Sequence, residues 1–515
     1  MRIERHSESV FPSSMSTQTE GLPLLPKTTP FFVPHVSSWM SWNTASPTFR
    51  FFFLVLLSLI PFASHFVTNE MSALQQFMLD DKSFPLTNTM YGALNSAVSI
   101  PNMIIPFFGG HIIDSRGHST ILWFLLLMCL GHALVTFAIS QEMFWLAFAG
   151  RILYGLGGGS VIVGGRAIVS YWFDSSEITF AVGVMVAFTS VSKMLAKATV
   201  APVSLYFGSY TYGLLYGLVV CLFSCIVALI AVQYIAHLNQ LKTSYQDQRG
   251  PLDPQLPWLN KFISTQGKRL RTAAAHSVPT LSSLKDFSAM FWILVVLHVV
   301  YVNVFHLFLN ISSSYLYQVH GYSIVKSGLV ASLSHVLVLF APLAGLVVDR
   351  VGGRVPVIVA SSAVGVLTYG LLLFTKTSPV VALLLVSVCL CATPTVLMAC
   401  VPLTIPKSRY GLAFGIAEVV DATGSFTGNL FVGYLRDATG SYTAVMYFLF
   451  GLAWFLLGLC VLLACLDRYN GNLLAQRGDL SSSRKISICD DSDPVVDIGP
   501  TLYTSSDEEK SVNEK

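Results

Sequence analysis

The sequence predicts an all-α membrane protein in which twelve transmembrane helices form two six-helix bundles. Of its 515 residues, 53% are hydrophobic and only 11% are charged. That share of polar groups is too small to cover the surface of a soluble protein of this length. The apolar residues also gather in long runs, and a helix needs about 20 of them to cross the ~30 Å hydrocarbon core. A short charged turn recurs at corresponding places in the two halves, which predicts a duplicated bundle.

Twelve apolar runs are long enough to be membrane spans. The first six are expected at residues 49–68, 90–113, 119–139, 143–172, 178–206 and 211–235. The last six are expected at residues 286–312, 324–348, 355–375, 379–403, 411–435 and 443–466. The fourth run exceeds the length of a perpendicular span, which predicts a tilted helix or an extended end.

The distribution of basic residues predicts the orientation of the spans. Lys and Arg gather between the sixth and seventh runs, in the duplicated turns and after the last run, whereas the intervening loops contain few. The positive-inside rule then places both termini in the cytosol. The predicted segments are a disordered cytosolic tail (1–46), a first bundle (47–237), a cytosolic linker (238–285), a second bundle (286–466) and a disordered cytosolic tail (467–515).

The duplicated turn contains charged residues between two apolar runs. Its first copy begins at Gly110 and contains Asp114 and Arg116, and its second begins at Gly345 and contains Asp349, Arg350 and Arg354. Glycine permits a tight reversal, and the charges lie at the polar boundary because they are costly in hydrocarbon. The pattern resembles the signature of the major facilitator superfamily, although Ser115 shifts the basic residue of the first copy. The resemblance implies that these charges hold a conformation closed toward the cytosol.

Several further segments narrow the resemblance. They are Ile100-Pro101-Asn102, Phe107-Phe108-Gly109-Gly110, Gly150-Arg151 with Gly155 to Gly158, and Gly411 to Gly415. Together they are similar to the major facilitator superfamily domain-containing protein 1 family. That likeness implies lysosomal export of dipeptides by facilitated diffusion, with a heavily glycosylated single-span accessory protein as partner. Where the family has an acidic residue and an arginine, this chain has Gly159 and Ser190, so the family's dipeptide selectivity carries over poorly.

The N-terminal tail carries a candidate sorting signal. Glu20, Leu24 and Leu25 match an acidic dileucine pattern, which a cytosolic sorting adaptor would bind, with a chance match as the alternative. The tail has no early apolar segment of the kind found in signal peptides. The sequon at Asn310 is expected at the non-cytosolic end of the seventh span, where it is a candidate for glycosylation.

Four charged residues within predicted spans are candidates for solute binding. Lys193 and Lys197 are one helical turn apart and therefore share one face of the fifth span. Glu418 and Asp421 present carboxylates from the eleventh span. In the functional interpretation these groups bind the two charged ends of a solute between the bundles. In the structural interpretation they form salt bridges that stabilise a gate.

Two arginines in the fourth span are also candidates for a special role. Arg151 is expected either to contact the ligand or to fix the first bundle by bonding carbonyl groups or a neighbouring helix. Arg166 is nearer the cytosolic end, where it is expected to reach the membrane surface or to pair with Asp174.

The sequence contains no recognisable nucleophile–base pair, metal-binding motif or cofactor loop, so it predicts neither an enzyme nor a cofactor. The glycines of residues 155–159 lack the lysine of a phosphate loop, and we interpret them as helix-packing positions. We expect a lysosomal transporter of a small polar solute, dipeptide-like or amino-acid-like, in contact with membrane lipids and not with nucleic acid. The alternatives are a plasma-membrane or organellar porter of another solute such as an organic anion, a proton-coupled symporter, and a non-transporting chaperone or receptor.

Overall fold

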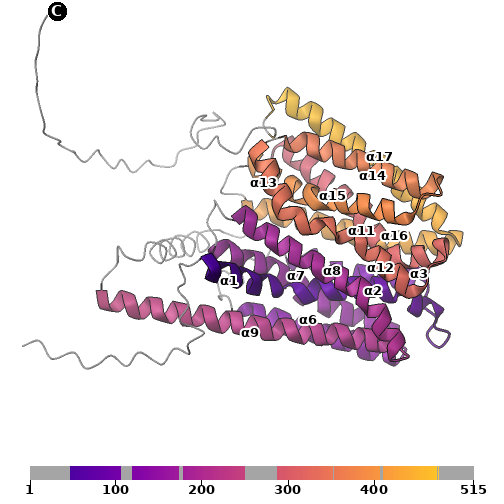
Figure 1. Cartoon of the computed structure of the whole chain (residues 1–515), viewed down its shortest axis with the longest axis horizontal. Helices are drawn as coiled ribbons and strands as arrows, with labels where there is room; N and C mark the ends of the chain where they lie inside the picture. Colours follow the sequence, from indigo (N-terminus) through magenta and orange to yellow (C-terminus); the bar gives the residue numbers. More distant parts are fainter. Residues whose placement is uncertain are drawn as a thin grey trace, which may run out of the picture. The chain divides into compact units, whose positions relative to one another are not determined.

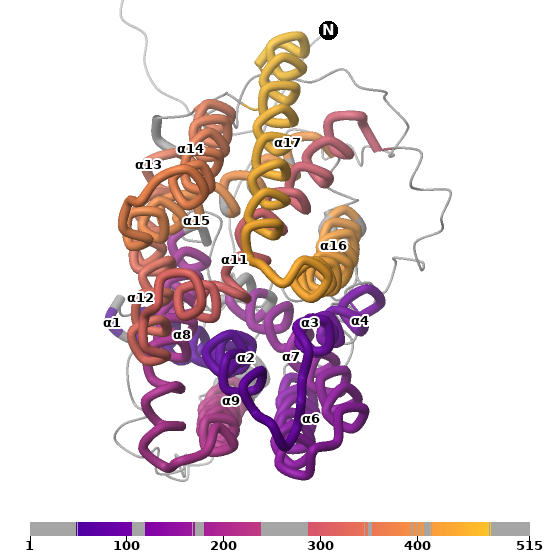
Figure 2. Tube along the Cα trace, turned by 90° about the vertical axis from the view of Figure 1, so that its right-hand side faces the viewer, coloured from indigo at the N-terminus to yellow at the C-terminus, as the bar shows by residue number. Residues whose placement is uncertain are grey.

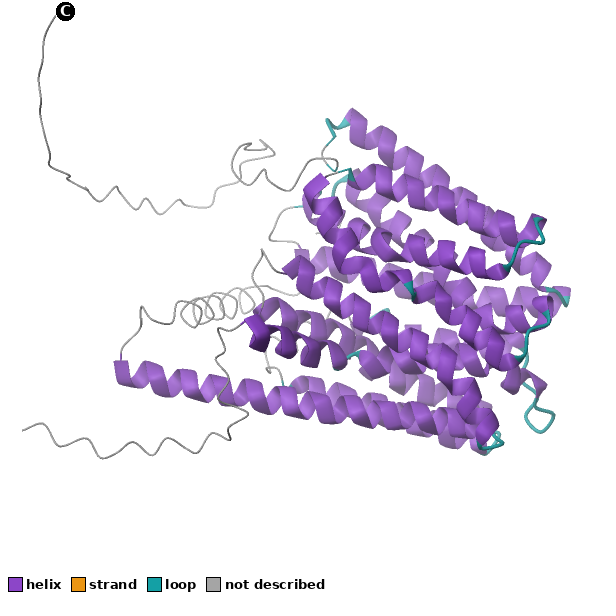
Figure 3. Ribbon diagram, in the orientation of Figure 1, coloured by secondary structure: helices purple, strands orange, loops and turns teal. Residues whose placement is uncertain are grey.

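The computed structural model describes residues 47–105, 119–172, 178–249, 287–351, 353–405, 410–472 and 474. These residues form helices and loops, and no strand occurs among them (Figure 3). The chain divides into two compact units, residues 1–52 and 53–515. The second unit contains nearly all of the helices.

The helices of the first half overlap the first six predicted spans. They are α1 (Pro47–Leu59), α2 (Phe62–Asp80), α3 (Asn88–Ala97), α4 (Ser99–Asn102), α6 (Thr120–Ser140), α7 (Phe144–Trp172), α8 (Ile178–Tyr206) and α9 (Tyr210–Arg249). The first predicted span corresponds to α1 and α2, which are bent by 41° at a short break.

The helices of the second half account for the other six predicted spans. They are α11 (Ala289–His320), α12 (Ile324–Ser332), α13 (Ala341–Val351), α14 (Arg354–Phe374), α15 (Pro379–Cys400), α16 (Tyr410–Thr439) and α17 (Tyr442–Tyr469). Short 3₁₀ segments connect α12 to α13 at Leu333–His335 and Leu337–Phe340, and another follows α15 at Val401–Leu403.

Polar residues at the helix ends explain several of these boundaries. Thr87 accepts a hydrogen bond from the backbone N–H of Met90 and caps the start of α3. Ser323 caps α12 in the same way through the N–H of Lys326. Gly321 ends α11 with φ of 64°, a left-handed conformation that glycine adopts without strain.

Nine helices among the described residues are long and apolar enough to cross a membrane, or ten if the bent pair is one span. Two predicted spans fall outside this count. The second span, which begins with α3 and α4, continues into residues outside the described ranges. The eleventh span, α16, is less apolar because it contains Glu418, Asp421, Arg436 and Asp437.

Two predicted span ends are wrong, and one helix continues beyond its span. The first span was expected to end at residue 68, but α2 continues to Asp80. The sixth span was expected at residues 211–235, and the apolar part of α9 covers Tyr210–His237 in agreement with this, although the helix itself continues to Arg249. The seventh span was expected to end at residue 312, but α11 continues to His320. In each case a polar stretch continues the helix, because an apolar run sets only a lower limit on helix length.

The two halves lie side by side and touch through a few helix pairs. Figures 1 and 2 show α2, α6, α7 and α9 on one side and α14, α15 and α17 on the other. Between the halves, α3 packs on α16, α8 packs on α12 and α13, and α2 packs on α11. Buried apolar side chains form separate clusters in the two halves, so each half has its own core.

Glycines permit the closest helix contacts. A Cβ at Gly157 would lie 2.3 Å from the carbonyl oxygen of Phe124, so α7 approaches α6 more closely than any larger residue would allow. The interpretation of the α7 glycines as packing positions is confirmed at this residue. A Cβ at Gly92 would lie 2.5 Å from the carbonyl oxygen of Asn429, which explains how α3 fits against α16.

Candidate functional site

The end of the molecule that contains the loop between α2 and α3 is called the Asp81 end, because Asp81 is the first residue of that loop. The loops between α6 and α7, α8 and α9, α11 and α12, and α16 and α17 lie at the same end by chain order. Figure 3 shows most of the described loops gathered there, at the right of the view. The distribution of basic residues predicts that this end is non-cytosolic.

An ion pair joins the two halves well inside the helices. The Nη1 atom of Arg166 in α7 lies 3.3 Å from Oε1 of Glu418 in α16, and the two side chains are 57% and 37% exposed. Because both side chains are partly exposed, the ion pair borders a space that protein atoms do not fill. Arg166 therefore pairs with Glu418, whereas its predicted partner Asp174 lies outside the described residues.

Asp421 and Lys193 are close to this pair in the fold. Asp421 is three residues after Glu418 in α16, and its buried Oδ1 atom has no hydrogen-bond partner. Lys193 in α8 is partly buried, and its electrostatic neighbours include Arg166. No ion pair within the described part of the chain connects Lys193 to Glu418 or to Asp421. The predicted charges thus converge on one region without neutralising one another directly.

Lys197 differs from Lys193 because its side chain is completely buried. Its Nζ donates hydrogen bonds to the carbonyl oxygen of Leu309 at 2.6 Å, to Oγ of Ser312 at 2.9 Å and to Oγ of Ser72 at 3.3 Å. Leu309 and Ser312 belong to α11 in the second half. In this conformation Lys197 therefore connects the halves, and none of its three donors is left for a solute.

Arg151 is 1% exposed and lies within the first half. Its Nε donates to the carbonyl oxygen of Leu94 at 3.1 Å, and one Nη donates to Oδ1 of Asn95 at 3.4 Å. Its guanidinium carbon also lies 5.3 Å from the ring centre of Tyr154. Of the two roles expected for Arg151, this geometry favours attachment of α7 to α3.

Glu70 is a charged residue whose position the sequence pattern did not reveal. It was expected in a loop after the first span, but it is fully buried in α2. Its Oε1 lies 3.6 Å from Nε2 of His132, which is itself 2.9 Å from the carbonyl oxygen of Leu214. Gly217 makes space for the carboxylate, because a Cβ there would lie 1.8 Å from Oε2. The polar residues after position 68 hid the continuation of the helix.

The Asp81 end is closed by hydrogen bonds between the halves. Asp437, in the last turn of α16, accepts bonds from the backbone N–H and Nδ2 of Asn88 at 3.0 and 2.9 Å. It also accepts bonds from the N–H and Oγ1 of Thr89, both at 2.6 Å. A carboxylate at a helix N-terminus satisfies free N–H groups and complements the helix dipole. Asp437 thus binds the start of α3.

A second set of side chains reinforces this closure. Oε1 of Gln76 in α2 accepts hydrogen bonds from Oγ of Ser314 at 2.8 Å and from Nε2 of Gln318 at 2.9 Å, both in α11. Arg436 of α16 donates to Oε1 of Gln318 at 2.7 Å. The hydroxyl of Tyr442 in α17 donates to Oγ of Ser314 at 2.8 Å. The network connects four helices across the boundary between the halves.

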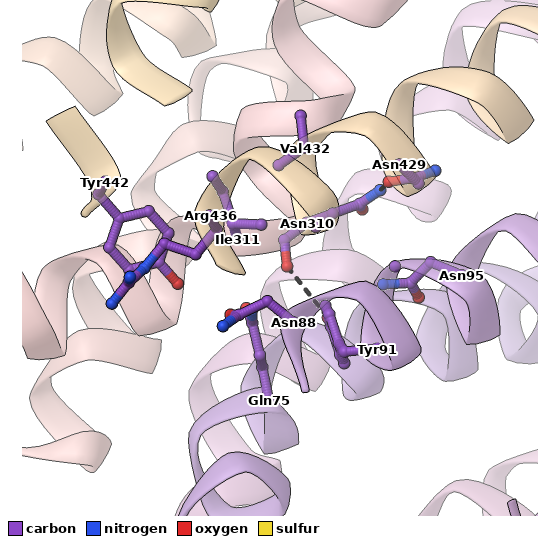
Figure 4. Close-up of a pocket in the computed structure, with 12 residues that line it drawn as sticks. Gln75, Asn88, Tyr91, Asn95, Asn310, Ile311, Asn429, Val432, Arg436 and Tyr442 are labelled. Atoms are coloured by element: carbon purple, nitrogen blue, oxygen red, sulfur yellow. Dashed lines mark hydrogen bonds between the residues drawn. The ribbon is translucent and has the colours of Figure 1, made fainter. Parts of the chain in front are cut away.

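A small pocket rich in carboxamide side chains lies behind this closure (Figure 4). Its lining includes Gln75, Asn88, Asn95, Asn310 and Asn429. Buried polar atoms of three of them, Gln75 Oε1, Asn88 Oδ1 and Asn95 Nδ2, have no hydrogen-bond partner. Such atoms cost free energy when they are kept from water. Their burial therefore offsets part of the stability that the closed Asp81 end gains from its hydrogen bonds.

Asn310 lies farther from the end of its helix than the apolar run predicts. It was expected at the end of the seventh span, but α11 continues for ten more residues to His320. Nδ2 of Asn310, the atom that a glycan would occupy, donates to Oδ1 of Asn429 at 2.8 Å, and its backbone oxygen accepts from the hydroxyl of Tyr91 (Figure 4). This packed position disfavours glycosylation.

The duplicated turns are only partly described. Asp114 and Arg116 lie outside the described residues, as do Glu20, Leu24 and Leu25 of the sorting signal. Asp349 and Arg350 are in the last turn of α13, but their side chains lie outside the described set. Arg354 is partly buried at the first position of α14, after Gly353 with φ of 77°. A role of these charges in gating stays a prediction.

Gly159 and Ser190 stand where the similar family has charged residues, and the structure shows what surrounds each of them. A Cβ at Gly159 would lie 2.0 Å from Oδ1 of Asn102, so no acidic side chain fits there unless Asn102 moves. Ser190 is buried, and its hydroxyl donates to the carbonyl oxygen of Val186 in its own helix. The charged groups of this chain are instead Arg166, Lys193 and the α16 carboxylates.

Comparisons with known proteins agree with this architecture. A model of the Major Facilitator Superfamily matches residues 36–428 and 336–483. The chain is 23% identical over 434 residues to the lysosomal dipeptide transporter MFSD1 of Homo sapiens, covering 82% of this chain and 88% of that protein. It is 24% identical to MFSD1 of Danio rerio, covering 82% and 87%.

The fold also resembles that of the proton:xylose symporter XylE. The TM-score is 0.60 at 14% identity, covering 82% of this chain and 96% of the other. The fold and the helix-embedded charges between its halves define a membrane transporter. The chain belongs to the Major Facilitator Superfamily, which confirms the predicted fold class.

Proposed function

We propose that this protein carries a small zwitterionic solute, dipeptide-like or amino-acid-like, across the lysosomal membrane by facilitated diffusion. The observation that carries the proposal is the unequal distribution of charge between the halves. Arg166 and Lys193 come from α7 and α8 of the first half, whereas Glu418 and Asp421 come from α16 of the second. A zwitterion needs a cation facing its carboxylate and an anion facing its amino group.

Electrostatics explains why such groups would select a zwitterion. Charges in a membrane span are costly, and they are retained where they face a cavity or a partner. Their attraction for a solute strengthens as water is excluded from the site. Asp421 has a buried oxygen without a partner, so an ammonium group of the solute would supply the hydrogen bond that it lacks.

The proposed transport cycle alternates between two conformations. In the one described here the Asp81 end is closed by Asp437 and Lys197, while Arg166 and Glu418 stay accessible to solvent. Opening of the Asp81 end would admit solute from the non-cytosolic side. Charges of the duplicated turns, Asp349 and Arg350 among them, would close the opposite end in that state.

The proposed location rests on two features. MFSD1 of Homo sapiens and Danio rerio, to which the chain is similar, are named lysosomal dipeptide transporters. The pattern of Glu20, Leu24 and Leu25 suits a sorting adaptor. We include in the proposal cytosolic termini and a glycosylated single-span accessory protein.

The proposal is tested with the purified full-length chain. A thermal-shift screen of dipeptides, amino acids, organic anions and sugars identifies ligands, because any molecule that binds the folded state stabilises it. Counterflow of labelled dialanine into proteoliposomes then measures transport, with the N-acetylated and C-amidated analogues as competitors.

We expect dialanine to be transported with or without a proton gradient and to be inhibited weakly by analogues that lack one charged end. Flux that collapses on addition of a protonophore would indicate a proton-coupled symporter. Transport of sugars or dianions in preference to dialanine would contradict the proposal.

A further inference from the structure

The ammonium group of Lys197 combines complete burial with a lack of counter-charge. An ammonium has three donors, and Leu309, Ser312 and Ser72 supply one oxygen for each of them. All three acceptors are neutral, and no carboxylate in the described residues forms an ion pair with Lys197. A buried charge without a partner is expensive even when it is hydrogen-bonded. The group is therefore satisfied geometrically but not electrostatically.

Lys197 also lies where the two halves touch. Ser72 belongs to α2 of the first half, which packs on α8, whereas Leu309 and Ser312 belong to α11 of the second half. On another side α12 approaches so closely that a Cβ at Gly328 would lie 2.3 Å from the carbonyl oxygen of Lys197. Separation of the halves at this point must break the bonds to Leu309 and Ser312 and leave the bond to Ser72.

Opening the Asp81 end therefore frees two donors of a positively charged group that faces the gap between the halves. A free ammonium in a partly desolvated gap attracts an anion, and a carboxylate supplies both acceptor atoms and the missing charge. Lys193, one helical turn toward the other end, adds a second positive charge on the same face of α8. This region of the open gap would attract a carboxylate more strongly than any neutral group.

We propose that Lys197 exchanges partners during transport. When the Asp81 end is closed, its ammonium bonds α11 and locks the halves together. When that end is open, the same ammonium receives the carboxylate of the entering solute. The bonds of Lys197 to α11 and its bond to the solute carboxylate then exclude each other. The Asp81 end therefore closes only after the carboxylate moves on toward Lys193. This inference rests on the proposed transport of a zwitterion and adds how entry is coupled to closure.

Two variants separate this mechanism from a purely structural lysine. Ser312→Ala removes one acceptor of the lock and keeps the ammonium. Lys197→Met removes the ammonium, keeps the length of the side chain and relieves a buried charge, so it is expected to fold. Ser313→Ala is the matched control, because Ser313 is the adjacent buried serine of α11 and its hydroxyl has no partner.

The readouts are hydrogen–deuterium exchange near the Asp81 end and affinity for dialanine and for dialanine amide, measured with full-length protein in nanodiscs. Both Ser312→Ala and Lys197→Met should raise exchange in residues 309–320, because each weakens the lock. They should differ in binding. Ser312→Ala should bind dialanine several-fold more tightly, whereas Lys197→Met should bind it about 10-fold or more weakly and should no longer prefer the acid to the amide.

Three patterns would contradict the inference. If Lys197→Met prefers dialanine to its amide as strongly as the wild type does, the ammonium does not receive the carboxylate and the inference fails alone. If Ser312→Ala behaves like Ser313→Ala in exchange and binding, the lock does not compete with the solute. If the wild type binds neither probe, the proposed function fails, and the inference fails with it.

Discussion

Charged side chains within the helices differ in whether their hydrogen bonds are satisfied. Lys197 donates to three oxygens and Arg151 to two, and both hold neighbouring helices together, although the buried Nη1 of Arg151 has no partner. Glu70 and Asp421 instead keep buried oxygens without a partner. Glu70 lies inside the first half beside His132, whereas Asp421 lies near Glu418 where the halves meet. Residues of the second kind at the boundary between the halves are the stronger candidates for solute contact.

We predict that Glu418, the partner of Arg166, is needed for transport but not for folding. Their ion pair is partly exposed, so it contributes roughly 0–1 kcal/mol to stability, and Glu418→Gln should leave the fold intact. We expect Glu418→Gln to weaken counterflow of dialanine about 10-fold, because the ammonium of the solute loses its anion. Competition by N-acetyl-dialanine, which has no ammonium, should not change.

The charge exchange of Arg166→Glu with Glu418→Arg is the control for this prediction. It restores the ion pair but places a cation where the solute needs an anion, so dialanine transport should stay low. Full recovery of transport in the double variant would show that the pair acts only as a gate.

The elements that meet at the Asp81 end explain how two helices of different halves are joined. The N-terminus of α3 has backbone N–H groups without a partner in the helix. The carboxylate in the last turn of α16 accepts hydrogen bonds from them. The contact depends on Gly92 and Gly433, whose missing side chains let the helices approach. A helix terminus is well suited to a reversible contact, because water replaces the carboxylate when the helices separate.

We predict that Asp437→Ala opens the Asp81 end. Loss of a carboxylate cap costs about 0.5–2 kcal/mol, which corresponds to a several-fold shift between closed and open conformations. Hydrogen–deuterium exchange in residues 88–97 and 430–439 should increase. Asp81→Ala is the matched control, because Asp81 accepts hydrogen bonds from Ser83 and Tyr210 within the first half. Equal exchange of residues 430–439 in the two variants would contradict a latch at Asp437.

The whole molecule places its polar contacts unevenly along the boundary between the halves. At the Asp81 end Asp437, Gln76 and Lys197 connect the halves through short hydrogen bonds. Farther from that end, Arg166 and Glu418 are exposed. Separate cores in the two halves would allow them to move as units in the proposed cycle, with the polar contacts at this end broken when it opens.

We predict that the dileucine pair determines the subcellular localisation of the protein. Replacing Leu24 and Leu25 together by alanine removes the apolar side chains that an adaptor pocket would bind. Immunostaining of intact cells should then detect the protein at the surface, whereas the wild type should colocalise with lysosomal markers. Glu20→Ala alone should give a weaker shift. An unchanged intracellular distribution of the double variant would exclude this dileucine pair as the signal.

The class of this protein, the order of its helices and the identity of four charges within them could be predicted from the amino-acid sequence. Many long apolar runs in one chain predict membrane helices, and Lys193, Lys197, Glu418 and Asp421 stood out because charge is rare in such runs. These are local properties, and a single chain displays them without knowledge of its neighbours. The same local information left the ends of α2, α9 and α11 uncertain, because polar residues continue a helix as readily as they end it.

Which charges meet could not be predicted from the sequence, because it depends on the packing of distant helices. Arg166 pairs with Glu418 rather than with a residue close by in sequence, and Lys197 bonds α11 although it shares a helix face with Lys193. Glu70 changed from an expected loop residue to a buried carboxylate, and Asp437 acquired a partner in the other half. These contacts join residues far apart in the chain. They depend on which helices pack together, and the sequence pattern of one helix does not identify its neighbour.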